Sequence, residues 1–247
     1  MLQNLFGLGV QYSVYVLELA LLIYLVFSQQ WKRLSGVCAY VCLFFLLDGV
    51  GRPYVLYHYG LSSREYGYFY WLTDVVLALG AFLLVCAFFR RACAHEKKLW
   101  NFISLLLIFV FILVPGVSLI SLTRNYDHLF SGFIYEFTQN LFFTCLVLNT
   151  LLYLLMQQIQ SADDELGLLV CGIGIQFAGP AASLALLHLT AAQSYARSLN
   201  SLVGPLCTVG MLLAWSYAVT RRPALAAQGG RAVAPDLAAE GALAESR

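Results

Sequence analysis

Residues 100–122 read WNFISLLLIFVFILVPGVSLISL, a stretch without a charged side chain. A helix needs about 20 mostly apolar residues to cross the hydrocarbon core of a bilayer, so this stretch is typical of a membrane span. Similar apolar stretches fill most of the chain. The sequence therefore predicts an all-α, polytopic bundle of about seven transmembrane helices, with spans at 10–28, 36–58, 67–90, 100–122, 132–157, 166–189 and 198–220.

The composition of the whole chain favours the same interpretation. Of its 247 residues, 61% are hydrophobic and 11% are charged, whereas charged residues make up about 25% of an ordinary soluble domain. A soluble protein this apolar would expose large hydrophobic patches. The formal net charge is +1 and no dense basic patch is present, so a nucleic-acid partner is not expected, whereas the lipid bilayer is.

The chain divides into a membrane domain and a tail. The connections between the spans are too short to hold a soluble domain, so residues 1–222 are expected to form one bundle with antiparallel neighbours. Residues 223–247 are rich in alanine and have no large apolar face, which predicts a disordered cytoplasmic tail. The first nine residues lack the basic segment of a cleavable signal peptide, so we expect the first apolar stretch to be retained.

The distribution of basic residues predicts the orientation of the bundle. Lys and Arg concentrate in cytoplasmic loops, and here they follow the first, third and seventh spans, as Lys32, Arg33, Arg90, Arg91, Lys97, Lys98, Arg221 and Arg222. This predicts an outer N-terminus and an inner C-terminus, and the short loops favour a bacterial inner membrane. Residues 163–165 are acidic on the predicted inner side, but acidic residues contribute little to this rule.

Polar and ionisable side chains lie inside several predicted spans, where they are costly and usually face the bundle interior. With the predicted topology, most of them fall in the outer half of the bundle, and Glu18 and Asp48 fall near its middle. We therefore expect an outward-facing cavity with acidic walls and an aromatic mouth. Its candidate ligand-binding residues are Glu18, Asp48, Arg52, Tyr70, Asp74, Glu136, Asn140 and Gln176.

Charge balance indicates what such a cavity would bind. Arg52 is the fixed cation expected within the membrane region, against the carboxyl groups of Glu18, Asp48, Asp74 and Glu136. The surplus acids must be protonated, hydrated or paired with a cation from outside. An acidic cavity lined by aromatic rings suits a small cationic molecule. The alternative is structural: Arg52 pairs with Asp48 four residues earlier, or ties the second span to the third through Asp74.

Motifs for catalysis, cofactors and metals are missing from the sequence. The histidines are scattered singly, and Cys38 and Cys42, one helical turn apart, have no further ligand nearby to complete a metal site. The lysines are Lys32, Lys97 and Lys98, so the last span has none to form a retinal Schiff base. We expect no catalytic residue, no metal and no cofactor.

Small residues and prolines in the later spans predict how the helices pack. Gly174, Ala178 and Ala182 recur every four residues, and such a face lets a neighbouring helix approach closely. Pro115, Pro180 and Pro205 each remove a backbone donor within a span. Prolines that kink their helices would permit rocking of one part of the bundle against another.

Three functional hypotheses remain. The first is a transporter- or permease-like protein that binds a small cationic molecule in the outer cavity. The second is a membrane sensor or accessory subunit, whose cytoplasmic loops at 90–98 and 163–165 contact a partner protein. The third is an intramembrane lipid-modifying enzyme in which the acids and Arg52 act as acid and base. The sequence favours a function other than catalysis.

Overall fold

The computed structural model describes residues 2–60, 63–94, 96–122, 129–159, 163–189 and 203–221. Apart from short turns these residues are helical, and they include no strand. The helices are α1 (Leu2–Phe27), η1 (Gln30–Lys32), α2 (Ser35–Phe44), η2 (Phe45–Gly51), α3 (Arg52–Tyr59), α4 (Arg64–Ala92), α5 (Lys97–Leu122), α6 (Leu129–Gln158), α7 (Asp164–Leu189) and a last helix, Val203–Arg221. The predicted tail, 223–247, lies outside the described residues.

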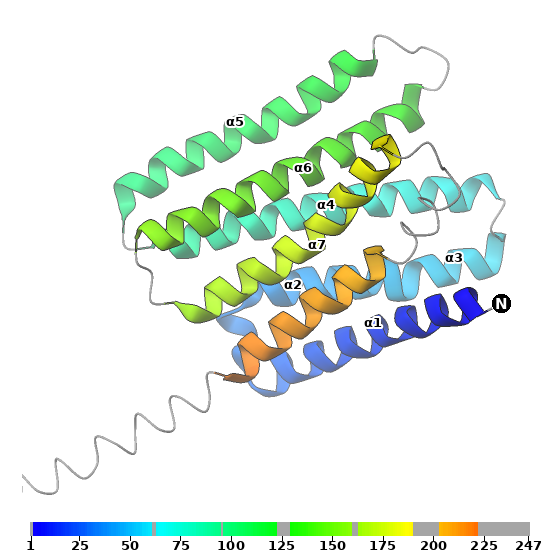
Figure 1. The fold of residues 1–247 in the computed structure, drawn as a ribbon, viewed down its shortest axis with the longest axis horizontal. Coiled ribbons are helices and arrows are strands. Elements are labelled where there is room, and N and C mark those ends of the chain that lie inside the picture. Colours follow the sequence, from blue (N-terminus) through cyan, green and yellow to red (C-terminus); the bar gives the residue numbers. More distant parts are fainter. Residues whose placement is uncertain are drawn as a thin grey trace, which may run out of the picture.

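The long helices lie side by side in one bundle, and consecutive ones run in opposite directions (Figure 1). α4 is the central element, because it contacts α2, α3, α5, α6 and α7. Its inward positions carry small and apolar side chains, such as Ala78, Ala81 and Val85, all fully buried. The start of α1 and the end of the last helix lie at opposite ends of the bundle (Figure 1).

Within the described residues, six helical segments are long and apolar enough to cross a membrane: Gly9–Phe27, Ser35–Tyr59, Arg64–Ala92, Lys97–Leu119, Glu136–Gln158 and Val203–Arg221. The prediction of an all-α bundle is thereby confirmed, and the six apolar segments are compatible with a multi-pass membrane protein. α7, with 26 residues, lies where the sixth span was predicted. Its membrane character, and with it the count of seven, stays a prediction.

The second predicted span is not a uniform α-helix. Between α2 and α3, residues Phe45–Gly51 form a π-helical segment, a rare geometry that often occurs at functional sites. Pro53 follows in the first turn of α3 and has no N–H to donate back along the helix. A Cβ at Gly51 would lie 3.1 Å from the Phe69 ring, so this residue lets η2 approach α4 closely.

Close packing of the last helix against α7 depends on two glycines. A Cβ at Gly172 would lie 2.6 Å from the Trp215 ring, and one at Gly179 would lie 2.7 Å from the sulfur of Cys207. The Trp215 indole is fully buried, and its Nε1 donates to the carbonyl of Leu169 at 2.9 Å.

The close-packed face of α7 differs from the predicted one. Ala178 and Ala182 are exposed, and a Cβ at Gly174 would meet the side chain of Asn149 on α6. The prediction named the right helix but the wrong face, because the sequence does not specify how a helix is rotated about its axis.

Charged residues from three connections pair at the end of the bundle where α7 begins. Arg91, at the end of α4, donates to Asp163 at 2.8 Å and to Glu165 at 2.7 Å, and Arg33 also donates to Glu165. The Glu165 side chain is only 1% exposed. The acidic group on the predicted inner side therefore has a structural explanation: it neutralises two of the arginines there.

Candidate functional site

Arg52 is the centre of the polar cluster that joins the second and third membrane-crossing segments. It lies where η2 gives way to α3, and its guanidinium reaches α4. Nη1 donates to Oδ1 of Asp48 at 2.6 Å, Nη2 donates to Asp74, and Nε donates to Oγ1 of Thr73 at 3.1 Å. The sequence predicted that Arg52 pairs either with Asp48 or with Asp74, and the structure forms both pairs at the same time.

The aromatic ring of Tyr70 completes this cluster. The guanidinium carbon of Arg52 lies 4.1 Å from the centre of the Tyr70 ring, an arrangement that attracts a cation to the ring face. Thr73 donates its hydroxyl hydrogen to the Tyr70 carbonyl at 2.7 Å, so its oxygen is left to accept from Arg52. The ring of Tyr66 stands 6.3 Å from that of Tyr70, one turn nearer the start of α4.

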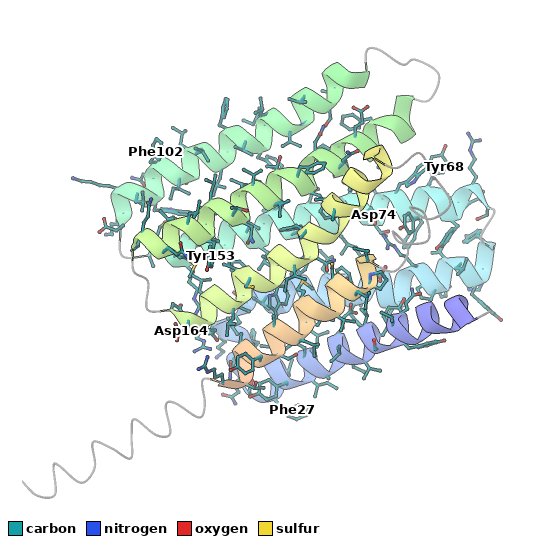
Figure 2. All side chains as sticks on the ribbon, in the orientation of Figure 1. Phe27, Tyr68, Asp74, Phe102, Tyr153 and Asp164 are labelled. Carbon is teal, nitrogen blue, oxygen red and sulfur yellow. The ribbon has the colours of Figure 1, made fainter. Side chains whose placement is uncertain are left out.

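The two carboxylates differ in accessibility. The side chain of Asp48 is 20% exposed and that of Asp74 is 35% exposed. Figure 2 shows Asp74 on α4, nearer the middle of the bundle than Tyr68. Two carboxylates share one guanidinium, so these three side chains carry a formal charge of −1. Asp74 is the more accessible place for a second cation.

Glu18, on α1, is buried beside this cluster without a partner. Its relative exposure is 0%, and neither carboxyl oxygen has a hydrogen-bond partner among the described residues. Asp48 lies close enough to act on it electrostatically. Tyr15, one turn earlier on α1, accepts from Gln11 at 2.9 Å and directs its hydroxyl toward the Asp48 carbonyl, 3.4 Å away.

The structure thus brings together five of the eight predicted site residues, and we call them the Arg52 cluster: Glu18, Asp48, Arg52, Tyr70 and Asp74. Thr73 belongs with them but was missed by the sequence analysis. The signal for Thr73 was its position beside Asp74, which places it one turn after Tyr70 on the helix that faces Arg52.

The other three predicted residues are not bonded directly to the Arg52 cluster within the described part of the chain. Asn140 on α6 donates to Ser118 on α5 at 3.1 Å, and Ser118, fully buried, donates to the Val114 carbonyl. Gln176 has a buried side-chain oxygen without a partner in the described part of the chain. No direct hydrogen bond or ion pair between described residues connects Glu136, Asn140 or Gln176 to the cluster.

The described residues contain no group of three His, Cys, Asp or Glu side chains placed to hold a metal ion. All seven cysteines are free thiols. The chemistry available at the Arg52 cluster is therefore that of carboxyl groups, one guanidinium and aromatic rings. These groups bind cations and exchange protons.

Comparison of the chain with protein-family models, with curated proteins and with solved structures gave no match. What the fold and the site define is a helical bundle with six segments apolar enough to cross a membrane and an acidic, arginine-centred cluster between two of them. The function is therefore argued from the chemistry of this cluster.

Proposed function

We propose that this protein spans a bacterial inner membrane seven times, with an outer N-terminus, and binds a small cationic molecule as a transporter- or permease-like protein. The observation that carries the proposal is that Asp48 and Asp74 share Arg52. One negative charge remains in excess at a place where aromatic rings gather. A cation with an amine or ammonium group supplies the missing positive charge.

Asp74 is the carboxylate at which we place this ligand. It is more exposed than Asp48, and Asp48 is tied to Arg52 within one helical segment. A ligand cation that takes Asp74 releases one donor of Arg52 and leaves the pair with Asp48 intact. This exchange avoids an unpaired buried charge, which would be strongly destabilising. The Tyr66 and Tyr70 rings offer further cation–π contacts.

The π-helical segment supplies a place where binding can change the structure. Arg52 follows η2 directly, and its link to Asp74 holds this segment against α4. A ligand at Asp74 loosens that link. Movement at η2 and Pro53 would then shift α3 relative to α4, as transport through alternating conformations requires.

The orientation is supported by the basic residues of the structure. Lys97 and Lys98 are exposed at the start of α5, at the end of the bundle where Arg33 and Arg91 pair with α7. Basic loops of this kind stay in the cytoplasm. The Arg52 cluster then lies between the middle of the membrane and its outer side.

The test is ligand-dependent stability of the purified, full-length protein. Methylammonium and tetramethylammonium chloride are added, with sodium chloride as the ionic control. We expect a probe at 100 times its Kd to raise the thermal midpoint of the wild type by about 5 °C. Glu65→Gln, which alters an exposed acid at the start of α4, should respond in the same way, and Asp74→Asn should not respond.

Flux of the same probe into liposomes then separates transport from sensing. Uptake that depends on Asp74 supports a transporter. Binding without uptake favours the sensor, which would need a partner protein for its output. Equal midpoint shifts in the wild type and in Asp74→Asn would contradict the assignment of the site.

A further inference from the structure

Glu18 has a chemical environment that binding of a cation at Asp74 alone does not explain. Both of its carboxyl oxygens are buried in the bundle without a hydrogen-bond partner among the described residues. An unpaired carboxylate in such a place costs several kcal/mol, because it loses its hydration and gains nothing in return. The neutral carboxylic acid is the form that fits the structure as it stands.

Asp48 on η2 is the ionisable group that acts on Glu18 electrostatically. Glu18 in turn acts on the hydroxyl groups of Tyr15 on α1 and Tyr40 on α2. Asp48 carries the only formal charge among these three at neutral pH, and it is negative. The field at Glu18 therefore opposes a second carboxylate for as long as the Arg52 cluster has a charge of −1.

A cation bound at Asp74 changes the charge of the group to which Asp48 belongs, because Arg52 links the two aspartates. With Glu18 neutral, the side chains of Asp48, Arg52 and Asp74 sum to −1. After a monovalent cation binds, the same sum becomes zero, and Glu18 can lose its proton so that the total returns to −1. Exchange of one cation for one proton thus keeps the charge inside the membrane constant, which avoids the cost of adding a net charge to a low-dielectric region.

We propose that Glu18 is the proton-binding group of this site, and that a cation bound at Asp74 displaces the Glu18 proton. The inference rests on the proposed function, and it adds a second, opposite substrate: the protein exchanges a small cation for a proton. In the exchange the O–H bond of the Glu18 carboxyl group breaks, the carboxylate stays on Glu18, and the proton passes to water. No electron is transferred.

The carboxyl groups differ in exposure in the direction that the proposed proton release requires. Exposure increases from Glu18, which is fully buried, through Asp48 to Asp74. The Tyr15 hydroxyl lies on the same face of α1 as Glu18 and points to the Asp48 backbone. Arg52 contacts both aspartates. Its rearrangement on ligand binding would free the proton to move from the region of Asp48 toward the more exposed Asp74.

The experiment counts protons during binding to the full-length protein in nanodiscs. Tetramethylammonium chloride is added in weakly buffered solution with a pH indicator dye, and sodium chloride is the control. We expect proton release from the wild type and from Glu65→Gln. Glu18→Gln should bind the probe without releasing a proton, and Asp74→Asn should neither bind nor release.

The affinity for the probe gives an independent readout. Because binding and proton release are linked reciprocally, raising the pH should strengthen probe binding to the wild type, by up to about tenfold per pH unit for one proton exchanged. Glu18→Gln should bind with an affinity that does not follow pH. Glu18→Asp keeps an acid and should retain the pH dependence.

Infrared spectroscopy tests the proton on Glu18 without any ligand and without a variant that must carry out the exchange. The wild type at neutral pH should show the carbonyl stretch of a protonated carboxyl group, and adding the probe should remove it. A spectrum without this band overturns the proposal. So does a Glu18→Gln variant that still releases a proton as the wild type does.

These outcomes separate the two proposals. A wild type that binds no probe contradicts the proposed function and, with it, the exchange. A wild type that binds the probe at Asp74 but releases no proton contradicts only the exchange, and the cation site stands.

Discussion

Arg52 and Asp74 join two successive apolar helical segments, Ser35–Tyr59 and Arg64–Ala92, through a hydrogen bond from Nη2 of the guanidinium to a carboxylate oxygen. The same guanidinium donates to Asp48 on its own segment, so the link between the segments depends on how one cation is divided between two acids. The Arg52–Asp74 pair therefore holds the two segments together. In our proposal it is also the contact that a ligand replaces.

The coupling between these two residues is measurable. In a double-mutant cycle of Arg52→Gln and Asp74→Asn, we expect the loss in stability of the double variant to be smaller than the sum of the single losses, by about 1–3 kcal/mol. Thermal or denaturant unfolding in detergent gives the three values. Glu65→Gln in place of Asp74→Asn should give additive losses, since Glu65 is exposed. Additivity in the Arg52–Asp74 cycle would contradict the pairing.

Glu165 should contribute more to stability than its neighbour in the sequence. It accepts from both Arg33 and Arg91 and is buried, so Glu165→Gln removes the carboxylate that Arg33 contacts and leaves Arg91 with Asp163 alone. The expected loss is about 3 kcal/mol. Asp164→Asn, at an exposed position one residue away, should change the unfolding free energy by less than about 0.5 kcal/mol. Similar losses of stability for both variants would show that the ion pairs of Glu165 with Arg33 and Arg91 do not hold α7 in place.

Gly172 and Gly167 provide a matched pair on α7. A methyl group at Gly172 would overlap the buried Trp215 ring, whereas nothing lies within 4 Å of one at Gly167. Gly172→Ala should therefore lower the unfolding free energy by about 1–3 kcal/mol. Gly167→Ala should raise it by about 0.5–1 kcal/mol, because alanine is the better helix former. Equal effects on the thermal midpoint would show that the last helix does not pack on Gly172.

Cys93 should react slowly with thiol reagents. Burial raises the pKa of the Cys93 thiol, and the thiolate is the form that reacts. At pH 8 it should therefore be labelled by maleimide more slowly than a cysteine at the exposed neighbouring position, introduced as Ala94→Cys. The labelling rate of Cys93 should keep rising with pH after that of the control has levelled off. Equal rates at pH 8 would contradict the burial of this thiol.

The predicted orientation can be tested with the same chemistry. In a cysteine-free background, Ala94→Cys and Glu65→Cys place single exposed thiols at the two ends of α4. A membrane-impermeant maleimide added to intact spheroplasts should label the second variant alone. Inverted vesicles should give the opposite result. Labelling of Ala94→Cys in intact spheroplasts would reverse the assigned topology.

Local sequence patterns were enough to predict some of these features and not others. The membrane-crossing segments follow from runs such as 100–122, because the length of an apolar run depends only on neighbouring residues. The π-helical segment was not predicted, because its apolar residues have the same local pattern as the α-helices on either side of it. The packed face of α7 was predicted wrongly, because the rotation of a helix is set by partners such as Trp215.

The candidate site shows the same division. The spacing of four residues predicted an ion pair between Asp48 and Arg52. Charge balance identified Glu18 and Asp74 among the acids in excess of the one arginine. Only the tertiary structure showed that both aspartates contact Arg52 at once and that Thr73 and Tyr70 complete the cluster. It shows no direct bond from Glu136, Asn140 or Gln176 to this cluster among the described residues.

The sequence by itself determined that the chain forms a helical bundle with long apolar segments, and that these segments carry more acids than bases, because composition and apolar length are properties of the chain alone. The tertiary structure decided which of these acids are paired. Asp48 and Asp74 both pair with Arg52, and Asp163 and Glu165 both pair with Arg91. Glu18 is buried, and neither of its carboxyl oxygens has a hydrogen-bond partner within the described residues. Pairing depends on distances between residues that are far apart in the chain, and only the packing of the helices fixes those distances.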